Sequence, residues 1–209
     1  MVRRTKEEAE QTRRQILSAA RDTFHQRGVG STSLEHIAQA AGLTRGAIYW
    51  HFANKEDLFK AMCQEVSIAL VNRMDYALLL DPHADPLERV RNFLQQLLDA
   101  LGEDGGLRRT LEILNFKCEF VGEMERDLID YIERSEECLG KLQQAYQAAQ
   151  RAGQLRAGLS PKRAALETLV FFNGLLRLRL LGVPVLQKGS ELKGLIGAHI
   201  DGMRASAPV

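Results

Sequence analysis

Residues 34–52 read Leu-Glu-His-Ile-Ala-Gln-Ala-Ala-Gly-Leu-Thr-Arg-Gly-Ala-Ile-Tyr-Trp-His-Phe, and this stretch decides the fold of the 209-residue chain. Its first half spaces apolar residues at i, i+3, i+4 and i+7, as one face of a helix requires: Leu34, Ile37, Ala38 and Ala41. Gly42 predicts the end of that helix, because glycine adopts positive φ at little cost. Two short helices joined by such a turn, at about residues 33–52, form a helix-turn-helix.

The second helix of this stretch has the composition of a recognition helix, which reads base edges in the major groove from its first turn. We expect Thr44 to cap it, Ala47 and Ile48 to face inward, and Trp50 to pack at the core or its rim. The forked guanidinium of Arg45 suits guanine O6 and N7. The candidate DNA contacts are Thr32, Ser33, Thr44, Arg45, Gly46, Tyr49, His51 and Lys55.

Each of these residues also has a simpler structural interpretation. Residues 32–35 form a candidate capping box, so Thr32 and Ser33 could serve the helix end alone. A single histidine such as His51 is more often structural than functional, and Tyr49 could pack on the surface. The short basic arm at residues 3–6 could reach DNA or remain a solvated terminus.

Residues 43–52, followed by Asn-Lys-Glu-Asp-Leu-Phe, resemble the TetR family of bacterial transcriptional repressors. The opening Arg-Arg-Thr-Lys-Glu-Glu-Ala and residues 108–124 resemble its AcrR/TtgR-like branch, which represses multidrug efflux pump genes. The resemblance implies an all-α, nine-helix fold with a DNA-binding domain at 1–54 and a ligand-binding and dimerisation domain at 55–209. It also implies phosphate contacts at Tyr49, His51 and Lys55, and base contacts at Arg45 and Gly46.

The rest of the chain reads as helices, with no convincing period-two alternation. The expected helices after the helix-turn-helix span about 55–80, 86–101, 107–120, 123–152, 161–181 and 190–203, and a first helix spans 7–27. Asn54 is expected to cap the long helix at 55–80, which belongs to both predicted domains and has the geometry of a lever. The glycines at 102, 105 and 106 are expected to interrupt the helix that begins at residue 86.

Composition limits the class of protein. Residues 1–60 carry ten Lys/Arg and seven Asp/Glu, a balance of +3, while residues 61–209 have a balance of −2. A basic head on a mildly acidic body fits DNA contact through one end, although scattered surface charge would look the same. Because the N-terminus is charged and has no apolar core segment, we expect no signal peptide, and the charged residues within the most apolar stretch of the chain lead us to expect no membrane span. Its three cysteines have no zinc or disulfide spacing, so we expect a cytoplasmic protein with reduced thiols, no metal and no cofactor.

The last two predicted helices carry broad apolar faces that suit a homodimer, in which two heads read two half-sites of a palindromic operator. An internal monomer core would use the same residues. The predicted interface comprises Leu166, Leu169, Val170, Leu176 and Leu180 with Leu192, Leu195, Ile196, Ile200 and Met203.

The same domain is expected to hold a small lipophilic or aromatic effector in an apolar pocket with a few polar groups. The candidate lining residues, assigned mainly by resemblance, are Val66, Ser67, Leu70, Phe93, Leu97, Leu111, Leu114, Asn115, Cys138, Leu142, Leu169, Phe172, Asn173, Leu176 and Arg177. Plain core packing is the alternative for each. Asn173, flanked by aromatic residues, is expected to need a partner if buried. Some relatives place an acidic or histidine group where this chain has Ser67, so we expect neutral or phenolic ligands.

These observations predict a ligand-responsive repressor, and two other functions compete with it. The sequence has no HExxH, GxSxG, Walker or dinucleotide-binding pattern, which argues against an enzyme. The second alternative is a helix-turn-helix regulator that senses oxidants through Cys63, Cys118 or Cys138. Such a sensor should respond to peroxide and lose that response on Cys→Ser substitution.

Overall fold

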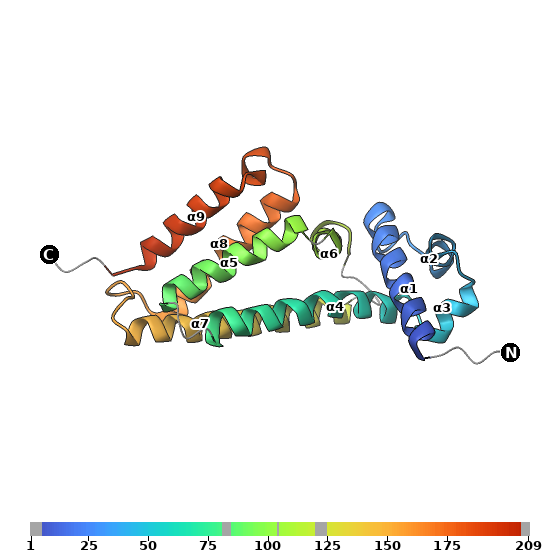
Figure 1. Ribbon diagram of the computed structural model, residues 1–209, viewed down its shortest axis with the longest axis horizontal. Helices are drawn as coiled ribbons and strands as arrows, with labels where there is room; N and C mark the ends of the chain where they lie inside the picture. The colour runs from blue at the N-terminus through green and yellow to red at the C-terminus, as the bar shows by residue number, and fades with distance from the viewer. Residues whose placement is uncertain (1–5, 81–84, 104, 120–124, 206–209) are drawn as a thin grey trace. The chain divides into compact units, whose positions relative to one another are not determined.

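A computed structural model describes residues 6–80, 85–103, 105–119 and 125–205, and within these ranges the chain is helical (Figure 1). Its α-helices are α1 (Lys6–Arg27), α2 (Leu34–Ala41), α3 (Arg45–His51), α4 (Lys55–Asp75), α5 (Pro86–Glu103), α6 (Gly105–Phe116), α7 (Glu125–Arg151), α8 (Pro161–Leu180) and α9 (Gly189–Met203). A π-helical turn, η1 (Tyr76–Leu80), follows α4, and a 3-10 turn, η3 (Pro184–Gln187), precedes α9. The extended pairing in the described part is a single bridge between Leu155 and Arg204.

The nine predicted helices are confirmed in type and order, with differences at their ends. The predicted helix at 55–80 is α-helical only to Asp75, because its last five residues take the wider π form. Helix α5 runs through Gly102 to Glu103, so that glycine does not interrupt it. Helix α6 begins at Gly105 and ends at Phe116, four residues before the predicted end at 120. Residue 120 and the Arg3 and Arg4 positions of the basic arm lie outside the described residues, whereas Lys6 is the first residue of α1.

Helix caps at three residues singled out in the sequence fix the ends of α2, α3 and α4. Gly42 has φ 65° and ψ 29°, and its N–H donates to the carbonyls of Ala38 and Gln39. Thr44 Oγ1 accepts from the Ala47 N–H, as predicted. Asn54 Oδ1 accepts from the Asp57 N–H at 2.8 Å, which confirms the cap of α4. Satisfying these otherwise unpaired N–H groups fixes where each helix begins.

The capping box of α2 is built from a different pair than the predicted Thr32 and Glu35. Ser33 is the N-cap, and its hydroxyl accepts from the His36 N–H at 3.2 Å. His36 Nδ1 in return accepts from the Ser33 N–H at 3.2 Å. In a capping box, the side chain of the third residue after the N-cap accepts from the N-cap N–H. With Ser33 as the N-cap, that third residue is His36 and not Glu35.

Residues 1–68 and 104–128 form one compact unit, and residues 69–103 and 129–209 form the other. The boundary between the units therefore lies inside α4, after Ile68. This division differs from the predicted domains 1–54 and 55–209, because α6 packs on α1 in the first unit. The functional division at residue 55 stays a prediction. No helix in the described part of the chain is long and apolar enough to cross a membrane.

The first unit has a buried core that joins the helix-turn-helix to α1, α4 and α6. Helix α1 contributes Ile16, Leu17, Ala20 and Phe24, and the rings of Phe24 and Phe59 meet edge to face at 5.8 Å. Ile37 and Ile48 bring α2 and α3 onto the same core, and both are fully buried. This packing leaves one face of α3 free of the core.

Polar contacts attach α6 to α1 beside that core. Arg21 Nε donates to the buried Thr110 Oγ1 at 3.0 Å, and Arg109 pairs with Asp22 at 2.9 Å. His25 Nε2 lies 2.6 Å from a carboxylate oxygen of Glu112. The Val29 N–H also donates to the Lys117 carbonyl at 2.9 Å. Helix α6 is therefore fixed to the first unit along its length.

The second unit packs α5 against α9 and sets η3 against α8 and α9. Asp85 Oδ1 caps α5 by accepting from the Glu88 N–H at 2.8 Å. Arg204, just after α9, pairs with both Asp85 and Glu88, which joins the start of α5 to the end of α9. Arg179 donates to the Leu186 carbonyl at 3.0 Å and so holds η3 on α8.

Candidate nucleic-acid interface and an apolar cleft

Helix α3 presents most of its length to solvent. Ile48 and Phe52 take the inward positions and are buried, whereas Arg45, Gly46 and Tyr49 are exposed. The structure thus places the two predicted base-reading positions on an accessible first turn. Gly46 has only the Thr44 hydroxyl within 4 Å of where a side chain would begin, so the backbone there is open.

Arg45 and Tyr49 form a contact within α3. A terminal nitrogen of Arg45 donates to the Tyr49 hydroxyl at 2.8 Å, and the guanidinium carbon lies 5.3 Å from the centre of the tyrosine ring. This hydrogen bond raises the pKa of Arg45, with a smaller contribution from Glu35 on α2. The guanidinium therefore has a defined position while its remaining donors stay open.

Two expectations for the end of α3 are wrong. Trp50 is 71% exposed and does not pack at the core, while His51, expected outside, is half-buried. Because successive residues turn by about 100°, position 50 lies roughly 200° from the buried Ile48, and position 51 returns toward the core. The His51 ring meets the Trp50 ring edge to face at 4.6 Å. Trp50 is therefore the residue that sequence reasoning missed on this surface.

The other predicted DNA contacts differ in how accessible they are. Ser33 and Thr44 are exposed at the starts of α2 and α3. Thr32 is buried and donates its hydroxyl to the Gly28 carbonyl at 2.7 Å, so we withdraw it from the predicted contacts. Lys55 Nζ donates to the Val29 carbonyl at 3.0 Å. Its charge remains on the surface, but its hydrogen bonds also stabilise the loop before α2.

The predicted effector residues divide between the two units. Val66, Ser67, Leu111, Leu114 and Asn115 belong to the first, and the other ten belong to the second. Val66, Phe93, Leu142 and Phe172 are buried. Asn173 is exposed, so the condition of burial is not met, and its amide donates to the Leu169 carbonyl at 2.8 Å. It faces outward because Phe172 and Leu175 occupy the buried positions of α8.

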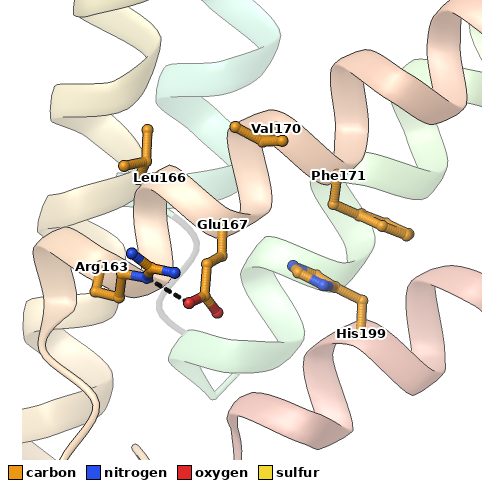
Figure 2. A pocket seen from close by; sticks show the side chains of 6 residues that line it. All are labelled: Arg163, Leu166, Glu167, Val170, Phe171 and His199. Carbon is orange, nitrogen blue, oxygen red and sulfur yellow. Dashed lines mark hydrogen bonds and ion pairs between the residues drawn. The ribbon is translucent and has the colours of Figure 1, made fainter.

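Helices α8 and α9 border an open cleft of about 430 Å³ (Figure 2). Its wall is mostly apolar, and an ion pair between Arg163 and Glu167 lies on the α8 side. The rings of Phe171 and His199 stack at 4.2 Å with an interplanar angle of 5°. No member of the predicted effector set lies among the residues around this cleft: Arg163, Leu166, Glu167, Val170, Phe171 and His199. Sequence spacing gave no sign of the stack, since its rings come from different helices.

His199 ends a hydrogen-bonded chain that leads into the core of the second unit. Its Nε2 lies 2.9 Å from Thr168 Oγ1, which lies 2.6 Å from the Tyr146 hydroxyl. Tyr146 and Thr168 are fully buried, and burial raises the pKa of Tyr146 to about 12. When neutral His199 carries its proton on Nδ1, its Nε2 accepts from threonine, and threonine in turn accepts from tyrosine. Burial lowers the pKa of His199, and Glu167 opposes that effect.

The outward face beside this cleft contains only part of the predicted dimer interface. Leu166, Val170 and Leu195 are exposed, with exposed fractions of 43%, 64% and 42%. Five predicted members point inward and form core instead: Leu180, Leu192, Ile196, Ile200 and Met203. These five residues lie on the inner side of α9 and at the end of α8. The apolar residues that the sequence assigned to one interface are therefore divided between the core and the outer surface. Leu178, Leu181 and Val185 are exposed and were not predicted.

The cysteines do not favour the oxidant-sensing alternative. Cys63 is buried, and Cys118 and Cys138 are half-buried. Burial raises the pKa of Cys138 to about 11, which suppresses the reactive thiolate at neutral pH. Within the described ranges, no three His, Cys, Asp or Glu side chains gather as metal ligands would.

Comparison with known proteins agrees with this geometry. Residues 16–62 match the model for bacterial regulatory proteins of the tetR family, and residues 85–203 match the C-terminal region of MAATS-type transcriptional repressors. The chain is 37% identical over 206 residues to the HTH-type transcriptional regulator TtgR of Pseudomonas putida, covering 99% of this chain and 98% of that protein.

Two solved structures share the fold over at least 90% of each chain. One is NalD, the secondary repressor of the MexAB-OprM multidrug efflux pump in Pseudomonas aeruginosa, with a TM-score of 0.82, 30% identity, and coverage of 95% and 98% of the two chains. The other is a complex with triclosan of SmeT, the repressor of the Stenotrophomonas maltophilia multidrug efflux pump SmeDEF. That complex has a TM-score of 0.76, 29% identity, and coverage of 90% of each chain.

The hydrogen-bonded chain gives a prediction for stability. Thr168→Val should lower the free energy of unfolding by about 1–3 kcal/mol, because it leaves the buried Tyr146 hydroxyl unpaired. Thr168→Ser keeps the hydroxyl and serves as the control in urea unfolding.

The stability of the fold should also depend on pH through His199. Because folding lowers the pKa of His199 below 6.5, the contribution of its neutral form to the free energy of unfolding is fully present above that pH and is lost as the pH falls. His199→Gln should therefore flatten the fall in stability between about pH 6.5 and 5, and an unchanged slope would contradict this account.

Proposed function

The chain belongs to the tetR family of bacterial regulatory proteins, and we propose that it represses a multidrug efflux operon and is released from its operator by lipophilic or aromatic compounds. The accessible first turn of α3, with Arg45 and Gly46 in the open, carries the DNA-binding part. The efflux assignment is supported by NalD and SmeT, which are named as efflux-pump repressors.

DNA binding follows from the chemistry of the α2–α3 surface. Arg45 provides a fork that suits guanine, and Gly46 allows a close approach of backbone to the groove. Ser33, Thr44, His51 and Lys55 supply hydroxyl, ring and ammonium groups for phosphates, which position the protein without reading sequence. Tyr49 adds an exposed hydroxyl on the same surface. Trp50 adds an exposed indole beside them. We propose that these residues together bind one operator half-site.

A second copy of the chain would bind the other half-site. We propose that the outward face of α8 and α9, with Leu166, Val170 and Leu195, meets the same face of the partner across a two-fold axis. Exposed apolar side chains on adjacent helices are what a self-complementary interface needs. The cleft beside Phe171 and His199 would be covered in the same assembly.

Release by an effector follows if the compound prefers a conformer that cannot span two half-sites. Recognition helices of a bound dimer are separated by roughly 34–36 Å, one turn of DNA. Displacement of α4, which runs through the boundary between the two units, would change that separation. A coupling free energy of about 1–3 kcal/mol lowers operator affinity roughly 5- to 150-fold. Triclosan, a phenolic compound held by SmeT, is a suitable first probe.

The proposed function is tested with the duplex upstream of the gene. We expect mobility shifts to show tight binding to that duplex and weak binding to a scrambled one. Added triclosan should weaken operator binding by roughly 5- to 150-fold, while calorimetry confirms that triclosan binds. Equal affinity for both duplexes would rule out a specific repressor. A compound that binds without changing DNA affinity is not an effector.

Substitutions should separate base reading from phosphate binding. Arg45→Ala should abolish most discrimination between operator and scrambled duplex, because each good bidentate contact is worth about 1–3 kcal/mol against the wrong base. Lys55→Ala should weaken binding to both duplexes and reduce the salt slope by about one ion. Lys162→Ala, an exposed lysine on α8, is the control and should change neither quantity. Thermal unfolding of Lys55→Ala measures the separate loss of its loop contacts.

The dimer has its own test. At micromolar concentration, sedimentation velocity should show a dimer for the unmutated chain and a monomer for Val170→Glu. Two symmetry-related carboxylates would have to be desolvated at one interface, at a cost that exposed apolar contacts cannot offset. Ile132→Glu alters another exposed apolar side chain, on α7, and should stay dimeric. A monomeric unmutated chain would exclude this interface.

A further inference from the structure

The contact between Arg45 and Tyr49 gives the tyrosine a role beyond contact with DNA. The two residues are four positions apart on α3, so their side chains lie on the same face one turn apart. The guanidinium lies against the tyrosine in two ways, through a hydrogen bond of 2.8 Å and a ring contact of 5.3 Å. Both side chains are exposed, so neither is held there by the core.

The direction of the hydrogen bond matters for what each group can still do. The Tyr49 hydroxyl accepts from Arg45, so its own proton remains available to another acceptor. Arg45 uses one N–H of its fork and keeps other donors for a base. Glu35 on α2 adds a favourable charge interaction with the same guanidinium. Arg45 can therefore donate to a guanine while one of its nitrogens stays hydrogen-bonded to the Tyr49 hydroxyl.

We propose that Tyr49 is a positioning residue, which holds the Arg45 guanidinium on the outward face of α3 before DNA arrives and thereby sets base specificity. The proposal rests on the proposed function, in which Arg45 reads a base. A free arginine side chain samples many rotamers, and ordering them on binding costs affinity. An i,i+4 pair and an exposed cation–π contact together favour the ordered arrangement by roughly 3- to 10-fold.

A positioning role and a direct phosphate contact predict different losses of DNA affinity when Tyr49 is replaced. If Tyr49 acts through Arg45, its removal penalises the cognate base pair and spares non-specific DNA. If Tyr49 only binds a phosphate, its removal weakens binding to every duplex equally and leaves the salt slope unchanged, because the hydroxyl is neutral. Base-by-base binding data therefore separate the two roles.

The experiment uses the full-length chain and four variants: Tyr49→Phe, Arg45→Ala, the double variant of these two, and Tyr76→Phe. Tyr49→Phe removes the hydrogen bond and keeps the ring, and Tyr76, an exposed tyrosine outside α1–α3, is the matched control. Each variant is titrated against the operator, against operators with one base pair replaced, and against a scrambled duplex. Arg45→Ala identifies the base pair that Arg45 reads.

Tyr49→Phe is expected to lower discrimination at that base pair by roughly 1.5- to 2-fold, because only the i,i+4 hydrogen bond is lost and the ring contact remains. Affinity for scrambled duplex and the salt slope should be unchanged. In the Arg45→Ala background, Tyr49→Phe should have no further effect on discrimination. Tyr76→Phe alone should not change discrimination.

A uniform loss of affinity on Tyr49→Phe, an equal loss in the Arg45→Ala background, or no loss would overturn the positioning role. These outcomes leave the proposed function intact as long as Arg45→Ala itself costs discrimination. If Arg45→Ala leaves discrimination unchanged, base reading by Arg45 fails instead, and the positioning role fails with it.

Discussion

The left-handed conformation of Gly42 is the constraint on which the DNA-binding head depends. With φ at 65°, its N–H satisfies the last carbonyls of α2, and the Leu43 N–H returns to the Ala38 carbonyl at 2.9 Å. A residue with a side chain would resist this conformation. The turn sets the direction in which the chain enters Thr44 and α3. That direction decides which residues of α3 meet the core and which meet solvent.

The core of the first unit then fixes α3 through few contacts. Ile48 and Phe52 anchor a seven-residue helix that could not be stable alone. Helix α3 packs on α2 and α2 packs on α1, while polar contacts of Arg21 and Asp22 join α1 to α6. Because so little of α3 is needed for packing, most of its surface is free to carry recognition chemistry. Arg45 and Tyr49 occupy that surface and order each other.

In the second unit, unlike in α3, apolar residues are more numerous than the core needs. Its last helices bury a full inner stripe and still leave apolar side chains outside, at Leu166, Val170 and Leu195. A buried polar chain from Tyr146 through Thr168 to His199 ends beneath the stacked ring of Phe171. Such a chain tolerates little repacking, since each hydroxyl depends on the next. The geometry of the cleft is thereby tied to the interior of the unit.

Local spacing in the sequence is enough to predict the helices and the reading face of α3, and single residues such as Gly42, Thr44 and Asn54 predict several helix ends. Spacing also placed Arg45 on the accessible side. Tertiary structure decided what local pattern leaves open: that Trp50 is outside, that Thr32 is committed to the Gly28 carbonyl, and that Ile196 and Ile200 are core. It alone paired Phe171 with His199, since periodicity along one helix carries no information about which neighbour covers a given face.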